Sequence, residues 1–338
     1  MSEWVDNFKW LTGDEKPIIK SYEVEYGFGY HPLKRPIEYY INHGVINLDK
    51  PRGPTSHQVT AWVKHMLKVS KTGHGGTLDP MVSGVLPIGI ERATPAMRYI
   101  VGSYKEYIGV IHLHSDVGDD ELENVFKLFS RGRIYQKPPY RSSVRRRLRT
   151  KEIYELEVLE KENKDILFRI RCESGFYVRK LAHDIGLILG VGAHLSELRR
   201  IAAGPFNENH NLVSLYELAA AIYKYEEEGD ESLIRRVIMP YEYIFKFYPK
   251  IIVKDTAVAA ITYGAQLKAP GIIGIFGEFK KGDRVALFTK KSEVIAVAIS
   301  QYSSEEILKM DKGVVTVTER VFMERELYPP MWKHVKKD

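Results

Sequence analysis

Only one cysteine is present, Cys172, so the chain cannot form an intramolecular disulfide. The paired cysteines and clustered histidines of structural zinc sites are lacking too, and we expect no metal. Internal repeats and low-complexity segments are also missing. No run of eighteen apolar residues occurs, and the first ten residues do not resemble a secretion signal. We therefore expect an intracellular protein with no membrane partner.

The composition bounds the class of protein without naming it. The 338 residues, 44% of them hydrophobic, are enough for about two domains with real cores. A formal charge of +6 suits a nucleic-acid partner but also occurs in proteins that never bind one. Residues 131–151 hold nine basic side chains and no acid, interleaved with Tyr135 and Tyr140. We interpret this basic run as an RNA-binding surface, with a merely solvated face as the alternative.

The most distinctive stretch is KTGHGGTLDPMVSG, residues 71–84. Three glycines in four residues, interrupted by His74, allow positive φ and a close approach of the backbone to a ligand. Pro80 restrains Asp79 to an extended conformation, so a carboxylate projects from a rigid turn. An isolated Asp-Pro pair most often begins a turn or caps a helix, and this is the alternative role for Asp79.

This stretch resembles the motif of the pseudouridine synthases of the TruB and dyskerin class, in which the aspartate of GGTLDP is the catalytic carboxylate. The resemblance covers nearly the whole chain from about Tyr30 and includes GVINLDKP, GVGAHLSELRR and ERVFMERELYPPMW. It implies an α+β fold, with a mixed, mainly antiparallel sheet and flanking helices, followed by a small PUA β-barrel. It also implies that Asp79 acts as a nucleophile or as a base.

Two further residues take catalytic roles by the same resemblance. Tyr107, in KEY, stands where the family has a tyrosine that stacks on the target uracil and takes part in proton transfer. Arg179, in GFYVRKL, stands where the family has an arginine in a salt bridge to the catalytic aspartate, which would keep Asp79 ionised and oriented. Without the resemblance, Tyr107 is more typical of a packed strand residue and Arg179 of an exposed helix residue.

The remaining site residues are expected to bind the RNA substrate or to support the site. By resemblance, Leu198 lines the uracil pocket, and Arg199 or Arg200 contacts RNA. Lys50, in LDKP, is placed among the substrate-binding residues, and in the family its pair with Pro51 packs beneath the catalytic turn. His74 either fills the gap left by a flipped base or braces the turn. The stretch QKPPYRSSV and the arginines after it would border the RNA channel, which adds Arg141, Arg145 and Arg146.

Periodicity and turn signals predict the local structure. Strands are predicted at 44–51, 85–90, 105–113, 152–158, 165–172, 251–254, 284–289 and 294–299. Helices are predicted from Thr55 or Ser56 to about 67, at 119–129, 178–189, 214–225 and 256–264, and as a short helix that ends at 199–200. The acidic residues 226–230 are predicted to be a solvated loop.

Four segments are expected in the domain organisation. Residues 1–40 form an N-terminal extension that packs on the C-terminal domain, and residues 41–248 form the TruB-like catalytic domain. Residues 249–326 form the PUA domain, and residues 327–338 are a C-terminal tail. The extension is rich in aromatic residues, which makes it too apolar for a disordered tail.

The implied reaction detaches uridine from its ribose, turns it and rejoins it through carbon, and it requires no cofactor. Asp79 could attack the ribose, attack the base or remove a ribose proton, and the sequence does not choose among these. A non-catalytic RNA-binding scaffold would carry the basic run and the PUA-like domain, but it would not need Asp79, Tyr107 and Arg179 together.

Within the family we favour the catalytic subunit of an H/ACA guide-RNA particle acting on rRNA, and also on the tRNA T-arm as a secondary expectation. The long extension and the full-length PUA-like domain support this over a stand-alone TruB-type tRNA enzyme. Its partners would be an H/ACA guide RNA, a zinc-ribbon protein, a β-barrel protein and a kink-turn-binding ribosomal protein. No long lysine-rich tail follows Trp332, which looks archaeal and hence cytoplasmic; a eukaryotic counterpart would be nucleolar.

Overall fold

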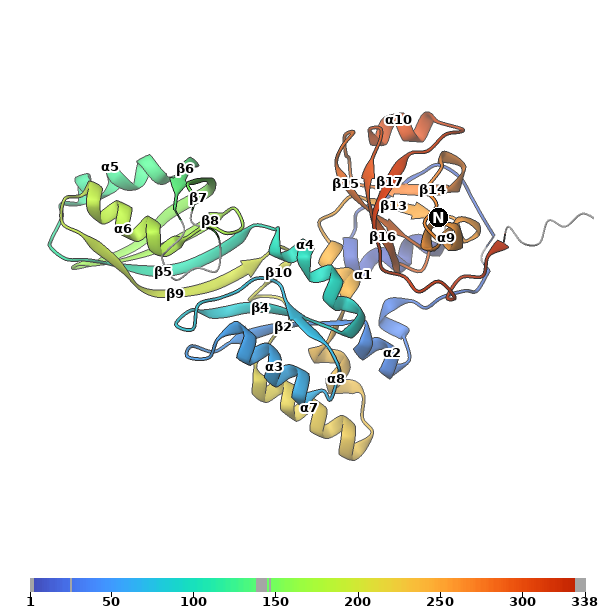
Figure 1. Ribbon diagram of the computed structural model, residues 1–338, viewed down its shortest axis with the longest axis horizontal. Coiled ribbons are helices and arrows are strands. Elements are labelled where there is room, and N and C mark those ends of the chain that lie inside the picture. The colour runs from blue at the N-terminus through green and yellow to red at the C-terminus, as the bar shows by residue number, and fades with distance from the viewer. Residues whose placement is uncertain (1–2, 25, 138–144, 146, 332–338) are drawn as a thin grey trace, which may run out of the picture. The chain divides into compact units, whose positions relative to one another are not determined.

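The computed structural model describes residues 3–24, 26–137, 145 and 147–331 (Figure 1). The chain divides into two compact units, which we call the central unit, residues 45–239, and the terminal unit, residues 1–44 with 240–338. Arg141 and Arg146, two of the predicted RNA-contacting arginines, lie outside the described residues. In the described part of the chain, every helix is too short or too polar to cross a membrane.

A mixed, mainly antiparallel sheet forms the centre of the central unit. Its strand order is β11-β2-β4-β9-β5-β8-β7-β6, and only the β11–β2 and β4–β9 pairs in this series are parallel. The short strands β3 and β10 pair with β4 and β9. The strand bounds are β2 Gly44–Lys50, β3 Thr72–His74, β4 Ser83–Ile90, β5 Lys105–Leu113, β6 Gly132–Gln136, β7 Arg149–Glu162, β8 Asp165–Cys172, β9 Ala193–Ala203, β10 Phe206–Asn207 and β11 Leu212–Val213.

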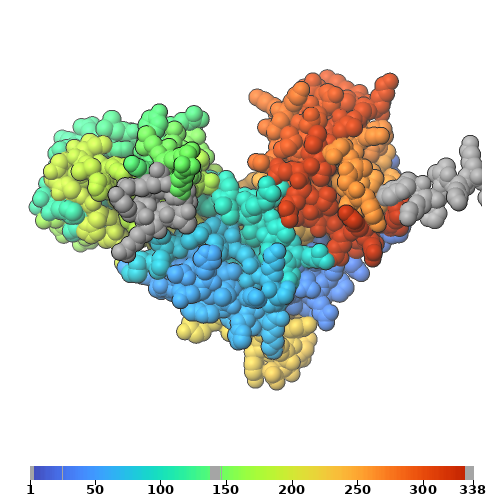
Figure 2. Space-filling model, in the orientation of Figure 1, coloured from blue at the N-terminus to red at the C-terminus, as the bar shows by residue number. Residues whose placement is uncertain are grey.

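Helices cover the sheet in two groups (Figure 1). Helices α5 and α6 lie over the part formed by β5, β9, β8 and β7, whereas α3 and α7 lie by β2 and β4. Figure 2 shows these two parts as adjoining surfaces, green to yellow-green and blue to cyan. The bounds are α3 Ser56–Met66, α4 Met97–Val101, α5 Asp119–Phe129, α6 Val178–Ile188, α7 Leu215–Glu228 and α8 Ser232–Val237, with a 3₁₀ helix at Glu91–Ala96.

The predicted start of α3 is confirmed and has a clear cause. The Thr55 hydroxyl accepts a hydrogen bond from the Gln58 amide at 3.1 Å, and the Gln58 side chain accepts one from the Thr55 amide at 2.8 Å. This reciprocal capping satisfies two backbone donors that the first helical turn leaves free. Helix α7 begins in the same way, with Ser214 and Glu217.

Two local predictions are wrong. Residues 193–200, predicted to include a short helix, lie in strand β9, which pairs with β5 along nine register positions and with β4. Sheet pairing on both sides outweighs the helical propensity of this segment. Helix α7 continues to Glu228, so the predicted acidic loop begins only at Gly229, whose left-handed φ ends the helix.

The terminal unit contains a sheet of order β1-β14-β13-β15-β16-β17, in which only β13 and β15 pair in parallel. Its strands are β1 Ile18–Ile19, β13 Lys250–Val253, β14 Ile272–Phe276, β15 Arg284–Phe288, β16 Val294–Ser300 and β17 Thr316–Val321. Its helices are α1 Lys9–Thr12, α2 Ile37–Asn42, α9 Asp255–Thr262 and α10 Ser304–Lys309, with 3₁₀ helices at Glu3–Phe8, Pro32–Lys34, Tyr241–Phe245 and Ala269–Gly271.

The N-terminal segment packs onto this sheet. Strand β1 pairs with β14, and the ring of Phe8 lies 5.0 Å from that of Phe276 and 5.8 Å from that of Phe288. Trp4 meets Phe276 edge-on at 6.1 Å. These aromatic contacts explain why a segment without sustained periodicity is ordered.

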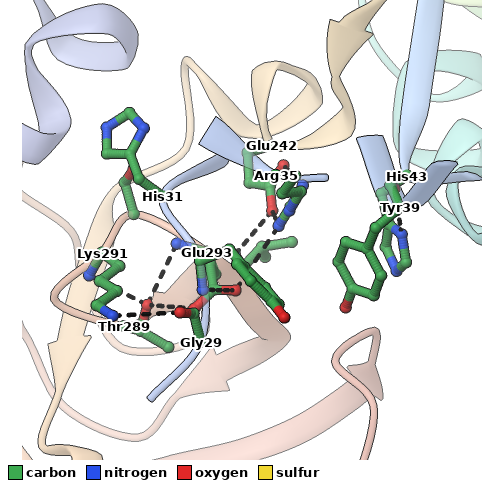
Figure 3. Close-up of polar contacts among 12 residues, drawn as sticks. Gly29, His31, Arg35, Tyr39, His43, Glu242, Thr289, Lys291 and Glu293 are labelled. Carbon is green, nitrogen blue, oxygen red and sulfur yellow. Dashed lines mark hydrogen bonds and ion pairs between the residues drawn. The ribbon is translucent and has the colours of Figure 1, made fainter. Parts of the chain in front are cut away.

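A buried ion pair also fastens the N-terminal segment (Figure 3). The Arg35 guanidinium donates two hydrogen bonds to the Glu242 carboxylate, at 2.6 and 3.0 Å, and both side chains are buried. Nearby, the Glu293 carboxylate accepts hydrogen bonds from the Tyr30 amide at 3.0 Å and from the Tyr328 hydroxyl at 2.9 Å. The charge on Arg35 is thus matched inside the protein by carboxylates.

Candidate active site

Asp79 and Arg179, a hundred residues apart, meet in the central unit. Asp79 follows the glycine turn between β3 and β4, and Arg179 lies in the first turn of α6. The Arg179 guanidinium donates a hydrogen bond to Oδ2 of Asp79. The side chains are 57% exposed for Asp79 and 61% exposed for Arg179, so a ligand from solvent can reach the carboxylate. A planar guanidinium at this position restricts how the carboxylate can turn.

The backbone of the turn is held from beneath by two side chains. The Ser56 hydroxyl accepts a hydrogen bond from the Leu78 amide at 2.8 Å and donates one to the Leu78 carbonyl at 3.0 Å. The Lys50 ammonium donates to the carbonyls of Pro80 at 3.2 Å and of Val82 at 2.8 Å. Because Lys50 is fully buried, its inclusion among substrate-binding residues is wrong, whereas its expected place beneath the turn is where the structure has it.

Tyr107 on β5 lies opposite Arg200 on β9 in the register of the sheet. The tyrosine side chain is 9% exposed. Burial raises the pKa of the Tyr107 phenol, and the Arg200 guanidinium beside it acts in the opposite direction. The phenol therefore keeps its proton at neutral pH.

Arg200 is buried, so the prediction that it contacts RNA is wrong. Its side chain is 1% exposed, with Nε donating to the Val85 carbonyl at 2.7 Å and Nη2 to the Gly76 carbonyl at 3.0 Å. Gly76 has a φ of +123°, which favours glycine, and a Cβ there would lie 3.5 Å from the Lys105 side chain. The glycine turn therefore lies directly over two buried cations, Arg200 and Lys105.

Arg199 points to the other side of β9 and is partly exposed. Its guanidinium bonds both oxygens of Asp49 at 3.0 Å and also donates to Glu208. Two carboxylates thus already hold the charge that was predicted to contact RNA. Any phosphate bound here would share the guanidinium with them.

Leu198 lines an open pocket whose walls include Met81, Ser83, Ile108, Val110 and Arg199. Gly109 also lines this pocket and leaves no room for a side chain, because a Cβ at this position would lie 2.9 Å from the Leu198 side chain and 2.8 Å from the Glu197 carbonyl. Asp79 is not part of the pocket wall, although Met81 follows it by two residues.

His74 lies in β3 and is half-buried, and its ring meets that of His57 edge-on at 5.0 Å. Burial lowers the pKa of His74, and the neighbouring His57 and Arg200 lower it further. A neutral imidazole packed in this way supports the turn geometrically, but its Nδ1 is buried with no hydrogen-bond partner among the described atoms.

The basic run is described only in part. Arg145, Arg147 and Arg149 are exposed, as a surface for phosphates requires. Lys151 is instead paired with Glu173 at 2.8 Å. Among the residues that the structure describes, no group of three or more histidines, cysteines or acids is arranged to hold a metal ion.

Sequence reasoning missed Lys105 and misplaced Arg200. Lys105 was treated only as the first residue of a strand, yet it is 5% exposed, and its ammonium donates to the Ile100 carbonyl at 2.6 Å and the Ser103 carbonyl at 2.9 Å. An assignment of residues 193–203 to a strand beside β5 would have placed Arg200 level with Tyr107.

Family models match successive parts of the chain. A DKCLD domain matches residues 8–60, and the N-terminal domain of TruB family pseudouridylate synthases matches 64–178. The C-terminal domain of tRNA pseudouridylate synthase B matches 179–246, and a PUA domain matches 249–322. The fold is thus that of an RNA pseudouridine synthase with an appended PUA domain.

Relatives that match over nearly the whole chain narrow this class of protein to one family. The protein named probable tRNA pseudouridine synthase B of Pyrococcus furiosus is 49% identical, over 92% of this chain and 91% of its own. That of Sulfurisphaera tokodaii is 49% identical, over 97% and 96%. The chain belongs to the TruB family of pseudouridine synthases.

Solved structures place it in the dyskerin-type branch of that family. A chain in the Cbf5–Nop10–Gar1 complex has a TM-score of 0.87 and 48% identity, covering 94% of this chain and 96% of that chain. A chain in an H/ACA RNP bound to a substrate RNA containing 2′-deoxyuridine has a TM-score of 0.87 and 46% identity, covering 94% and 98%. The predicted family, fold class and enzyme class are therefore confirmed.

Proposed function

We propose that this chain is the catalytic subunit of an H/ACA guide-RNA particle that isomerises uridine to pseudouridine in ribosomal RNA. The observation that carries this proposal is the likeness over 94% of the chain to proteins solved inside H/ACA complexes, one of them with substrate RNA. The match to a DKCLD domain at residues 8–60 supports it further, because it extends the likeness through the N-terminal segment.

Asp79 is the catalytic carboxylate in this proposal, as nucleophile or as base, and Arg179 orients it. The ion pair between them and their shared exposure support these roles. A guanidinium beside a carboxylate favours its ionised form, which both nucleophilic attack and proton removal require. Tyr107 is the proposed platform for the flipped uracil and Leu198 a proposed wall of the uracil site, whereas the open pocket described above for Leu198 includes neither Tyr107 nor Asp79. His74 braces the turn.

RNA is held by the basic run, in which Arg145 is exposed, as are Arg147 and Arg149; Arg141 and Arg146, which lie outside the described residues, are further proposed contacts. Exposed guanidinium groups without a neighbouring acid in the sequence suit a polyanionic backbone. Arg199 contacts RNA only if a phosphate competes with its two carboxylate partners.

Partners follow from the solved neighbours, which occur with Nop10 and Gar1. We propose that this chain binds two small proteins of those kinds, a zinc-ribbon protein and a β-barrel protein, together with an H/ACA guide RNA. A kink-turn-binding ribosomal protein is the third proposed partner. The particle is proposed to act in the cytoplasm of an archaeal cell.

The catalytic assignment is tested with Asp79→Asn in the reconstituted particle. We expect the single-turnover rate of pseudouridine formation to fall at least about a thousandfold while RNA affinity is retained. Asp165→Asn is the matched control, because Asp165 is an exposed carboxylate on β8 that pairs with His112 rather than with Arg179. An active Asp79→Asn variant would remove Asp79 from the mechanism.

A stand-alone tRNA enzyme is the second candidate, and the name shared by the relatives favours it. A tRNA with a T-arm uridine and a guide-matched rRNA fragment are each assayed with and without guide RNA and partner proteins. The proposal predicts that the rRNA fragment is modified only in the full particle. Efficient guide-independent modification of the tRNA together with an unmodified rRNA fragment would favour the second candidate.

A further inference from the structure

Three cationic side chains are buried together around the catalytic turn. Lys50, Lys105 and Arg200 are 0%, 5% and 1% exposed. Buried cations are normally paired with carboxylates, because an isolated charge in the protein interior is costly. In the described part of the chain, none of the three forms an ion pair; each is held by backbone carbonyls.

Arg200 connects the parts of the site. Its guanidinium donates to Val85 on β4 and to Gly76 in the glycine turn, and it lies against the Tyr107 phenol. Its backbone is fixed as well, because Arg200 is paired in the sheet with Tyr107 on β5 and with Gly84 on β4. A long, flexible side chain is thereby locked in one place and at one orientation.

Asp79 is the carboxylate whose charge acts on Lys50, one member of this cluster. Its charge raises the pKa of Lys50 against the larger effect of burial, and it also acts on Tyr107. Asp79 is exposed and already paired with Arg179, whereas the cluster lies behind it in the protein interior. The charge of Arg200 is therefore left largely uncompensated beside Tyr107, in surroundings where electrostatic effects are strong.

The reaction creates negative charge where Tyr107 is proposed to hold the base. When the C1′–N1 bond breaks, its electron pair stays on the uracil; the C1′–C5 bond then forms and the proton on C5 departs. If Asp79 instead first adds to the base, the displaced electron pair also moves into the uracil ring. Either route places negative charge on the ring before it is rejoined to the ribose.

We propose that Arg200 is a positioning residue whose uncompensated charge, presented through the Tyr107 phenol and the Gly76 turn, stabilises the uracil anion. This rests on the proposed function, in which Tyr107 holds the target base. A fixed charge aimed at developing charge lowers the barrier without reorganisation. Lys105 contributes less, because burial lowers its pKa to about 7 and it is only partly protonated at neutral pH.

The test compares uridine with 5-fluorouridine at the target position of a guide-matched RNA. The fluorine at C5 itself stabilises the uracil anion, so the reaction rate of the 5-fluorouridine substrate depends less on the charge of Arg200. Single-turnover cleavage of the C1′–N1 bond is measured in the full particle for wild type, Arg200→Met and Arg200→Lys. We expect Arg200→Met to slow the uridine substrate about tenfold more than the fluorinated one. Arg200→Lys leaves a second buried lysine beside Lys105, whose pKa burial lowers to about 7, so we expect its ratio of the two rates to lie between those of wild type and Arg200→Met.

An equal loss on both substrates in Arg200→Met would show a merely structural role and overturn the proposal. If Arg200→Met does not fold, as judged by circular dichroism, Arg200→Gln decides: a shift of the ratio in the same direction supports the proposal and an unchanged ratio overturns it. Lys250→Met is the control, because Lys250 is a buried lysine of the terminal unit held by two carbonyls. Wild-type particle that leaves uridine unconverted would instead contradict the proposed function.

Discussion

Buried cations are stabilised differently in the two units of this chain. In the terminal unit, Arg35 is matched by Glu242, and Lys290 lies 3.1 Å from Asp255 (Figure 3 shows the Arg35 group). In the central unit, Arg200 and Lys105 are held by carbonyls and lie beside hydroxyl groups, and neither forms an ion pair among the residues that the structure describes. A buried charge with an ion-pair partner attaches a segment to a sheet, whereas a buried charge without one produces an electric field that acts on a bound ligand.

One buried lysine does not follow this division. Lys250, in the terminal unit, is held by the carbonyls of Lys246 and Tyr248, and burial lowers its pKa to about 8 although the charge of Glu15 acts in the opposite direction. Lack of an ion pair is therefore not sufficient to indicate function. The central unit differs because its unmatched cations are grouped beneath one turn that carries an exposed carboxylate.

The largest effect is expected from breaking the matched pair in the terminal unit. Glu242→Ala leaves the Arg35 charge buried without its main partner, and we expect the free energy of unfolding to fall by about 4 kcal/mol, measured by urea denaturation. Glu278→Ala, which removes an exposed acid of the same unit, serves as the control. The double variant Arg35→Met/Glu242→Leu should regain most of the lost stability. If Glu242→Ala were as stable as the control Glu278→Ala, the buried ion pair would not stabilise the terminal unit.

Opposite pH dependences are expected from the two units. Burial raises the pKa of Glu293 to about 7, so between its ordinary value of 4.5 and 7 the folded state binds more protons and stability falls as pH rises. Burial lowers the pKa of Lys105 to about 7, so between 7 and its ordinary value of 10.5 the unfolded state binds more protons and stability rises with pH. Each contribution amounts to a few kcal/mol.

Chemical denaturation across pH checks both signs. Glu293→Gln should flatten the profile between about pH 4.5 and 7, and Lys105→Met should flatten it between about pH 7 and 10.5. If both variants showed the same dependence of unfolding free energy on pH as the wild type, Glu293 and Lys105 would not control that dependence.

Much of the fold was accessible from local pattern. The helix at Asp119–Phe129 and the strand at Lys105–Leu113 have the predicted bounds, because each is amphipathic or alternating over its whole length and ends at a turn signal. Segment 193–203 was not accessible in this way. Its strand conformation comes from pairing with β5 and β4, which are distant in the sequence.

The residues of the site divide in the same way, into those that the local sequence indicates and those that are placed by contacts distant in the sequence. Asp79 was located by a motif whose glycines and proline act locally, and the meeting with Arg179 was expected only through resemblance. Arg200 could not be interpreted from its neighbours, because an arginine is almost always at the surface and only the sheet register turns this one inward. The direction of the Arg200 side chain depends on which strands pair with β9, and strand pairing is a property of the whole fold.

Lys50→Met tests whether the unmatched cations also support the turn. The substitution leaves the carbonyls of Pro51, Pro80 and Val82 without their buried donor, and we expect a loss of about 2 kcal/mol in the free energy of unfolding, with slower isomerisation. Lys64→Met on the exposed face of α3 is the matched control. A stable Lys50→Met variant with slowed isomerisation would assign the lysine to electrostatics rather than to support.

Gly76→Ala separates the shape of the turn from the charge beneath it. A φ of +123° strains any residue with a Cβ, whereas the nearest side-chain atoms, of Lys105 and Arg200, would be at an ordinary contact distance. We therefore expect the free energy of unfolding to fall by only about 1 kcal/mol, measured by thermal unfolding. Gly118→Ala is the control, because Gly118 has a φ of −64° and a Cβ there would meet no other atom. Because both cations remain, the rate ratio for uridine and 5-fluorouridine should stay at its wild-type value even if both rates fall. A changed ratio would mean that the turn, and not Arg200, sets the field at the base.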